Sequence, residues 1–150
     1  FKLYIFGLFD NNPSSIKRSK LLRMIKFHNN CHFKEVNYGV KIKKIFSDKD
    51  VFILPSYREG LPKSALEAMC YKNALLLSDI PGHSKLINSK KNSNGIYFKV
   101  RDKNDLAKKI IWSLKNRKKI QYFINNSHQN LFQFLSTNVN KTFYEIIKKK

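Results

Sequence analysis

Short apolar runs recur along the chain between longer, lysine-rich stretches, and this alternation constrains the fold more than any other feature. The clearest run is VFILP at 51–55, which is β-branched and aromatic and is stopped by Pro55. Such runs are too short for ordinary helices and apolar at nearly every position, so they predict strands buried on both faces. Strands are expected at residues 2–6, 31–36, 51–55, 74–78 and 95–100.

The stretches between the runs are typical of helices. Residues 63–72 are strong helix formers. Further helices are expected at 16–27 with Ser14 or Ser15 as N-cap, at 40–46, at 102–119 with Leu106, Ile110, Ile111 and Leu114 on one face, and within 120–149. Strands that alternate with helices predict an α/β fold, here a Rossmann-like parallel sheet flanked by helices.

The charge of the chain is strongly basic, with 30 Lys and Arg against 10 Asp and Glu and a net charge of +20. Only 5 of the 30 are Arg, and 16 Asn and 15 Ile accompany the Lys, which indicates a compositional drift. Because nucleic-acid recognition relies on Arg forks, nucleic acid is an unlikely partner. The 42% hydrophobic content excludes a disordered chain, and no apolar run reaches the length of a membrane-spanning helix.

Cysteine and histidine residues show no metal-ligand spacing, so no metal site is expected. Cys31 and Cys70 are interpreted as reduced, buried thiols, and Trp112 as a core residue. Among the four histidines, only His83 falls in a loop at a predicted strand end, where a loop-capping or solvated role is expected.

The segment after the strand at 51–55 is the best candidate site, because ligands of open parallel sheets bind at the carboxyl ends of strands. Here Gly60 to Lys63 would present free amides at a helix start, between the carboxylates Glu59 and Glu67. Two simpler interpretations stay open. Glu59 could be a solvated carboxylate paired with Arg58 or Lys63, and Glu67 could close a capping box with Ser64.

These residues carry a resemblance to a known family. VFILPSYREGLPKSALEAM, followed by LLLSDIPGH and NGIYFKVRDKNDLAKKI, resembles the nucleotide-sugar half of a retaining glycosyltransferase of family 4, which has the two-domain GT-B architecture. Glu59 and Glu67 match the E-x7-E motif of that family. The resemblance runs from about Phe1 to Lys119.

The resemblance implies roles for individual residues. Glu59, the implied catalytic residue, would lie near the anomeric centre of the transferred sugar. The amides of Gly60, Leu61 and Lys63 would face the sugar and diphosphate, and Glu67 would accept hydrogen bonds from the ribose. The turn Asn37, Tyr38 and Gly39 would line the nucleobase. No cofactor is implied, because backbone amides and basic side chains can neutralise the leaving diphosphate.

Some positions depart from the family pattern. Lys72 and Ala74 stand where the family has Gly and Pro, and Lys85 where it often has Glu. A Lys at a helix end that Gly usually occupies in the left-handed conformation costs about 1 kcal/mol, unless Asn73 adopts that conformation instead. The chain begins at Phe1, and the family's first strand, its phosphate-binding loop and its acceptor domain are not in the sequence. A fragment that is inactive alone is therefore expected.

Taken together, the sequence predicts a nucleotide-sugar-binding domain at 1–130 and a basic helix at 131–150. The intact enzyme would move a hexose from a UDP- or GDP-sugar to a glycan or lipid-linked acceptor, with retention. A cytoplasmic location is expected, with contact of the basic helices at the inner face of the membrane as an option. The alternatives are a non-catalytic basic α/β module that binds nucleic acid or an anionic surface, and a decayed remnant.

Overall fold

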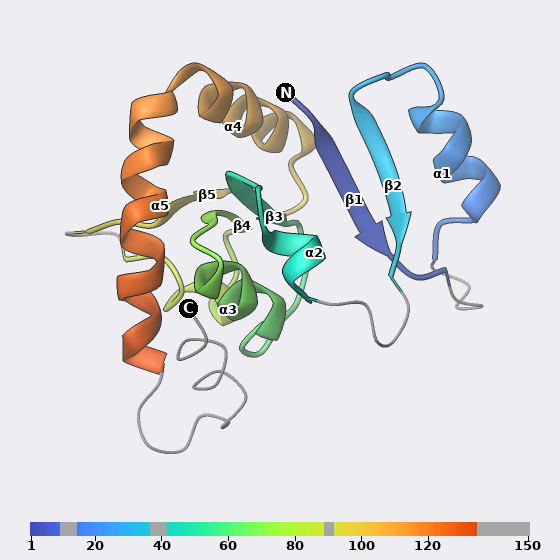
Figure 1. Cartoon of the computed structure of the whole chain (residues 1–150). Helices are drawn as coiled ribbons and strands as arrows, with labels where there is room; N and C mark the ends of the chain where they lie inside the picture. The colour runs from blue at the N-terminus through green and yellow to red at the C-terminus, as the bar shows by residue number, and fades with distance from the viewer. Residues whose placement is uncertain (10–14, 37–41, 89–91, 135–150) are drawn as a thin grey trace. The chain divides into compact units, whose positions relative to one another are not determined.

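The structure is a computed structural model that describes residues 1–9, 15–36, 42–88 and 92–134. It divides into two compact units, residues 1–45 and 46–150 (Figure 1). The described strands are all parallel to their neighbours, and they form a two-stranded sheet in the first unit and a three-stranded sheet in the second. Parallel pairing with helical connections is the predicted α/β class.

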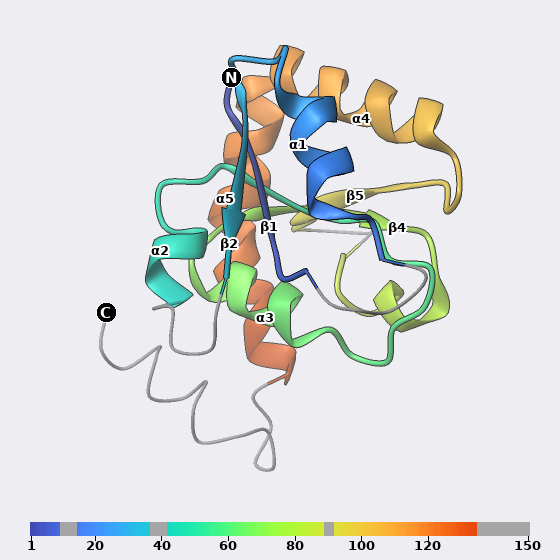
Figure 2. The same ribbon diagram turned by 90° about the vertical axis from the view of Figure 1, so that its right-hand side faces the viewer.

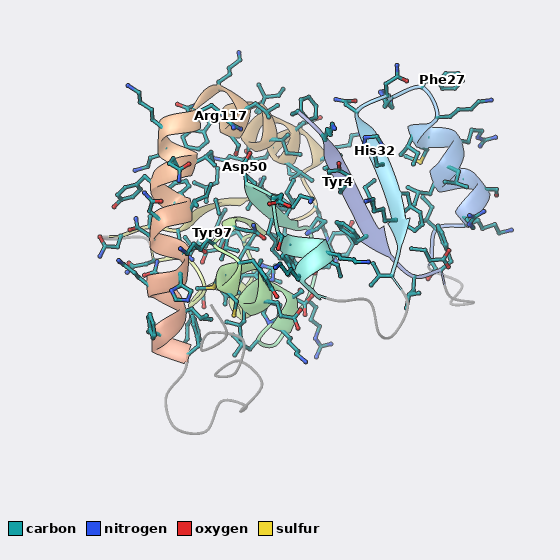
Figure 3. The ribbon with its side chains drawn as sticks, viewed as in Figure 1. Tyr4, Phe27, His32, Asp50, Tyr97 and Arg117 are labelled. Atoms are coloured by element: carbon teal, nitrogen blue, oxygen red, sulfur yellow. The ribbon has the colours of Figure 1, made fainter. Side chains whose placement is uncertain are left out.

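The first unit contains β1 (Leu3–Gly7), α1 (Arg18–Ile25) and β2 (Cys31–Glu35), and α2 (Ile42–Phe46) follows at its boundary. The register pairs Leu3 with Cys31, and α1 packs on β2. Tyr4 and His32, which lie on neighbouring strands (Figure 3), have ring centroids 5.3 Å apart. None of the described side chains before residue 46 is fully buried.

The second unit is built around the parallel sheet β3 (Val51–Leu54), β4 (Ala74–Ser78) and β5 (Gly95–Phe98), with β4 in the centre. Every residue of β4 is buried, as its run of apolar residues predicts. The connection from β3 to β4 is the helix α3 (Lys63–Cys70), and the connection from β4 to β5 contains the 3₁₀ turn η1 (Pro81–His83).

Two long helices complete the second unit: α4 (Lys103–Lys115) and α5 (Arg117–Leu131), after which the turn η2 (Phe132–Phe134) ends the described chain. Both α3 and α5 pack on β4 and on each other, and α4 runs at a steep angle to α5 (Figure 2). The core contains Met69 from α3, Leu76 from β4, and Phe123 and Leu131 from α5, all at most 2% exposed. Trp112 packs half-buried against this core, which confirms its predicted place.

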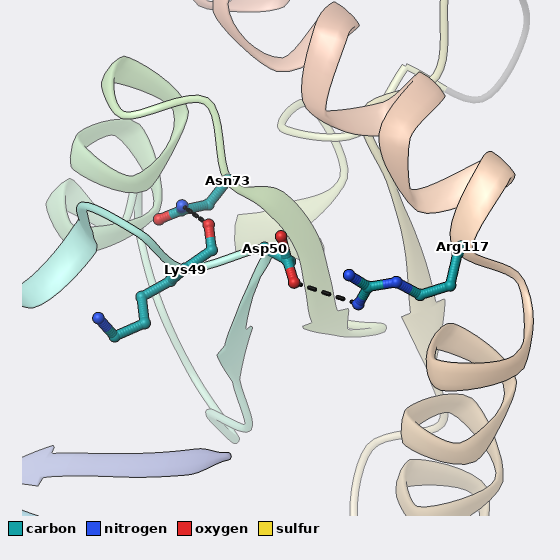
Figure 4. Close-up of polar contacts among 4 residues, drawn as sticks. All are labelled: Lys49, Asp50, Asn73 and Arg117. Carbon is teal, nitrogen blue, oxygen red and sulfur yellow. Dashed lines mark hydrogen bonds and ion pairs between the residues drawn. The ribbon is translucent and has the colours of Figure 1, made fainter. Parts of the chain in front are cut away.

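The amino end of β4 is held by Asn73 (Figure 4). Its side-chain amide donates to the carbonyls of Phe46 (3.1 Å) and Lys49 (2.6 Å), and the Ser127 hydroxyl on α5 donates to the Asn73 carbonyl at 2.6 Å. The neighbouring Asp50 forms an ion pair of 3.2 Å with Arg117. These contacts connect α3, β3 and α5 at the end of the sheet opposite to the predicted site.

The predicted strands are confirmed, and several finer predictions on helices are wrong. The helix at 16–27 starts at Arg18 with Lys17 as N-cap, so Ser15 is not the cap, and Ser14 lies outside the described residues. The helix predicted at 102–119 is broken at Asn116, whose amide and side-chain Nδ2 both bond to the Trp112 carbonyl at 2.9 and 2.8 Å. An Asn side chain that competes for backbone groups favours a helix end.

Other expectations concern single side chains. Ile111 is 51% exposed and does not share the buried face of α4. Cys70 is buried as predicted, whereas Cys31 is only half-buried because the first unit has no enclosed core; both are free thiols. Of the basic helix predicted at 131–150, the structure describes only Leu131, which ends α5, and the turn η2, and the rest lies outside the described residues.

Candidate functional site

The candidate site is the segment that follows β3 and leads into α3, at the carboxyl end of the three-stranded sheet. Pro62 is the N-cap of α3, with extended backbone at φ −70° and ψ 113°. Its carbonyl accepts the first helical bonds, from Ala65 (3.1 Å) and Leu66 (3.3 Å). The amides of Lys63 and Ser64 therefore precede the helical bonding pattern and are directed out of the helix start, where the helix dipole favours an anion.

Glu67 lies on α3, one turn after Lys63. Its side chain is only 13% exposed, and Lys63 Nζ lies 3.9 Å from Glu67 Oε1. Burial raises the pKa of the Glu67 carboxyl above its ordinary value, and the Lys63 ammonium lowers it in part. A carboxylate this buried with one long contact has unused acceptor capacity.

The capping-box interpretation of Glu67 is wrong. A capping box needs Ser64 at the N-cap and Glu67 three residues later. Because Pro62 is the N-cap, Ser64 is already the second residue of the helix, and the cap has no side-chain hydrogen bond. Glu67 is thus not used to close the helix start.

Glu59 lies in the loop before α3 and is half-buried. Its Oε1 accepts a hydrogen bond of 2.7 Å from the Ser56 hydroxyl. The alternative interpretation, a pairing of Glu59 with Arg58 or Lys63, does not hold: Glu59 accepts from Ser56, and the Lys63 ammonium lies 3.9 Å from Glu67. A serine bond orients the carboxylate without neutralising its charge, so the charge of Glu59 stays available to a ligand.

The turn η1, after β4, packs directly against this loop. A Cβ added at Gly82 would overlap the carbonyl oxygens of Glu59 and Gly60, whereas a Cβ added at Gly60 would meet nothing within 4 Å. Gly82 is therefore required by close contact between two backbones. The neighbouring His83 is 0% exposed, so a solvated histidine is excluded, whereas its Nδ1 lies 2.8 Å from the Ser78 carbonyl oxygen, as a loop-capping histidine requires.

The predicted site residues are thus partly brought together. Glu59 and Gly60 in the loop and Lys63 and Glu67 on α3 lie around one helix start, with Gly60 exposed and Leu61 51% exposed. The predicted nucleobase turn, Asn37, Tyr38 and Gly39, lies outside the described residues.

Ser56 and Ser78 were not among the predicted site residues. The signal that could have indicated them is their place directly after the apolar runs of β3 and β4, where polar side chains reach the carboxyl edge of the sheet.

Within the described ranges, no group of three His, Cys, Asp or Glu could hold a metal ion. No helix of that part of the chain is long and apolar enough to span a bilayer. An open hollow of about 620 Å³ lies between α1 and β2, and another of about 270 Å³ lies beside Asp50 and Arg117. Neither hollow contains a residue of the candidate site.

Residues 1–130 match the family described as glycosyl transferases group 1, and the chain belongs to this family. This confirms the predicted glycosyltransferase domain. A similar protein from Campylobacter jejuni, N,N'-diacetylbacillosaminyl-diphospho-undecaprenol alpha-1,3-N-acetylgalactosaminyltransferase, is 29% identical over 125 residues, which are 83% of this chain and 31% of that protein.

Solved structures confirm the Rossmann-like α/β fold. HepE from Anabaena in complex with UDP-glucose has a TM-score of 0.75 at 16% identity, over 99% of this chain and 41% of that chain. The C-terminal domain of the group 1 glycosyl transferase LpcC from Francisella tularensis has a TM-score of 0.65 at 16% identity, over 81% of this chain and 61% of that one. The chain thus spans less than half the length of HepE and about a third of the Campylobacter protein.

Proposed function

We propose that this chain is the donor-binding half of a glycosyltransferase that moves a hexose from a nucleoside-diphosphate sugar to a glycan or lipid-linked acceptor, with retention at the anomeric carbon. The observation that carries the proposal is the helix start of α3, bracketed by the serine-oriented Glu59 and the largely buried Glu67. Support comes from HepE, which binds UDP-glucose and UDP, and from the Campylobacter relative, whose name describes a sugar acceptor linked to undecaprenol.

The donor is assigned to the site by the chemistry of each group. The amides of Gly60, Leu61 and Lys63 face the sugar and the diphosphate, because a helix start concentrates positive partial charge. Glu67 accepts hydrogen bonds from the two ribose hydroxyls, which suits a carboxylate with unused acceptor capacity. Asn37, Tyr38 and Gly39 are proposed to line the nucleobase.

Glu59 is proposed to lie beside the anomeric centre, where positive charge develops as the bond to the diphosphate breaks. A carboxylate held by Ser56 stabilises that charge without having to reorient during the reaction. The negative charge that develops on the leaving diphosphate is balanced by the α3 amides and by Lys63. The proposal needs no cofactor.

The acceptor side of the reaction belongs to the same proposal. A lipid-linked acceptor would place the enzyme at the inner face of a membrane, with basic helices in contact with anionic lipid headgroups. The division into a donor-binding domain at 1–130 and a basic helix at 131–150 is also proposed, and the matched family region ends at residue 130.

Calorimetric titration with UDP and then GDP at moderate salt tests the proposal. We expect millimolar to micromolar binding of one nucleotide, lost in Glu67→Ala and retained in Asp50→Ala. Asp50 is a matched control because it is a carboxylate at the opposite end of the sheet. A folded chain that binds neither nucleotide, or a Glu67→Ala variant that binds as well as the parent chain, contradicts the proposal.

The same titration separates the donor site from a general basic surface. Binding to a basic surface falls steeply with salt and does not depend on Glu67. Binding at the α3 start depends on Glu67 and changes little with salt.

A further inference from the structure

A series of hydrogen bonds runs from β4 to the Glu59 carboxylate. Ser78, the last residue of β4, is 1% exposed, and its hydroxyl donates to the Ser56 carbonyl at 2.5 Å. The Ser56 hydroxyl donates in turn to Glu59 Oε1 at 2.7 Å. Because Ser78 fixes the backbone of Ser56, and Ser56 holds Glu59, the central strand determines where the carboxylate points.

His83 extends this series of hydrogen bonds beyond Ser78. Its Nδ1 lies 2.8 Å from the Ser78 carbonyl oxygen and 3.4 Å from the Ser78 hydroxyl. A carbonyl oxygen can only accept, so the imidazole carries a proton on Nδ1. The His83 carbonyl accepts a bond of 2.8 Å from the hydroxyl of Tyr97 on β5, which is labelled in Figure 3.

The second nitrogen of His83 is buried and has no hydrogen-bond partner among the described residues. A buried polar atom without a partner destabilises a fold, and an apolar side chain of similar size would avoid that cost. If the side chain at position 83 served only to fill the core, an apolar residue would therefore give a more stable fold than histidine. Its Nδ1 bond to Ser78 is the property that an apolar residue cannot supply.

The same turn touches the site at a second point. Gly82, next to His83, packs against the carbonyl oxygens of Glu59 and Gly60 so closely that a Cβ could not fit. The position of His83 thus affects the loop twice, through Ser78 and Ser56 to the Glu59 side chain, and through Gly82 to the Glu59–Gly60 backbone.

We propose that Ser78 and His83 are positioning residues for donor binding, which hold Glu59 and the Gly60 amide in the geometry that the nucleotide sugar requires. Neither residue touches the donor in this proposal. The inference rests on the proposed function for its effect on binding, but its effect on the loop is independent of any ligand.

The test compares two buried serines in the whole chain. Ser78→Ala and Ser127→Ala each remove one hydroxyl that donates to a backbone carbonyl, at opposite ends of β4. We expect both to lower the urea midpoint similarly. Only Ser78→Ala should speed hydrogen exchange at the Gly60 and Leu61 amides and weaken binding of UDP or GDP, by about tenfold, as expected for one lost hydrogen bond.

Rescue separates positioning from packing at His83. Asn can place a donor near the position of Nδ1, whereas Leu has a similar volume and no donor, so His83→Asn should retain more nucleotide affinity and slower Gly60 exchange than His83→Leu. Nitrogen-15 shifts of the ring should show the proton on Nδ1. The proposal is overturned if Ser78→Ala and Ser127→Ala show the same hydrogen exchange at the Gly60 amide. It is also overturned if His83→Asn and His83→Leu show the same Gly60 exchange and the same nucleotide affinity.

The outcomes distinguish this inference from the proposed function. If the parent chain binds no nucleotide, the proposed function fails, and the ring protonation and Gly60 exchange still decide the positioning role. If the parent chain binds and Ser78→Ala binds equally well, the proposed function stands and the positioning role fails.

Discussion

Glu67 is an ionisable residue of the candidate site that the fold largely buries. Its side chain is 13% exposed, and desolvation raises its pKa from the ordinary value of 4.5, against a smaller opposite effect of Lys63. Relative to the unfolded chain, the fold therefore shifts the equilibrium of this carboxyl toward its protonated form. Between pH 4.5 and the raised native pKa, the native state binds more protons than the unfolded state, so stability falls as the pH rises through that window.

This pH dependence can be measured with Glu67→Gln. We expect the variant to gain stability relative to the parent chain as the pH rises through the window above 4.5, and the difference to become constant above it. Urea unfolding followed by circular dichroism across the acid range checks this. A difference that does not change with pH would contradict the assigned burial.

Asp102 gives a contrast of opposite sign in the same experiment. Hydrogen bonds from the amides of Asp105 and Asn104 lower the pKa of its carboxyl below 3.8. Its contribution is present above 3.8 and is lost as the pH falls below that value. Asp102→Asn removes this titrating group. We therefore expect the urea midpoint of the variant to fall less steeply than that of the parent chain as the pH drops below 3.8.

Lys72 stands where the family has Gly, and this departure lowers the stability of the chain. Its φ of 61° is left-handed, and the amides of Lys72 and Asn73 donate to the carbonyls of Met69 and Ala68, both at 3.0 Å. This is the Schellman ending of a helix, which Gly usually completes. Asn73 does not adopt the left-handed conformation in place of Lys72, because its side chain is committed to Phe46 and Lys49.

We therefore expect Lys72→Gly to stabilise the chain. The gain should be about 0.5–1 kcal/mol, since relief of the left-handed strain exceeds the extra freedom that glycine adds to the unfolded chain. Lys72→Ala, which keeps the Cβ, is the matched control and should show no such gain. Urea midpoints of the three proteins decide, and equal midpoints for Gly and Ala would exclude left-handed strain as the cause.

At the scale of elements, the contact between η1 and the Glu59 loop joins two strand ends that are 22 residues apart at Ser56 and Ser78. The glycine in η1 makes that contact possible. The last register pair between β3 and β4 is Leu54 with Leu77, so Ser56 and Ser78 follow that pair by two residues and one residue. Their hydrogen bond is thus a consequence of strand register.

The pair Gly82→Ala and Gly60→Ala tests this contact. A methyl at Gly82 would overlap two backbone oxygens, and we expect a loss of about 1–3 kcal/mol, as in overpacked cores. A methyl at Gly60 meets no atom within 4 Å, so its effect on stability should stay within about 0.5 kcal/mol. Thermal unfolding compares the two, and similar losses would show that the loop and η1 are not in contact.

The whole molecule combines two units of different burial. The second unit contains β4, whose residues are all buried, whereas none of the described side chains before residue 46 is fully buried. Regions with few buried apolar contacts open locally at lower free energy. The stability of the chain therefore resides mainly in residues 46–134.

Hydrogen exchange measured by mass spectrometry should show this difference. We expect the amides of β4 to exchange last and those of β1 and β2 to exchange earlier, although both sheets are parallel and hydrogen-bonded. Exchange of all five strands at one common rate would mean that the two units unfold together.

The sequence by itself determined the strands, the α/β class and the family, because hydrophobic runs and motif spacing are local properties. The role of the pair Glu59 and Glu67 stays a prediction from motif spacing. Local pattern was also the source of the errors. A single helix was predicted at 102–119 because periodicity does not register the bonds that Asn116 makes to the Trp112 carbonyl. The predicted capping box does not form because the helix starts two residues earlier than that motif requires, with Pro62 as its N-cap.

Only the tertiary structure decided the surroundings of the site. In the structure His83 is buried, the Ser78 hydroxyl donates to the Ser56 carbonyl, and Gly82 contacts the backbone of Glu59 and Gly60. These contacts join residues that are separated by 22 or more positions in the chain and depend on strand register and on how turns stack at the sheet edge. Residue type and spacing reveal which groups can act, whereas packing across strands determines how those groups are held.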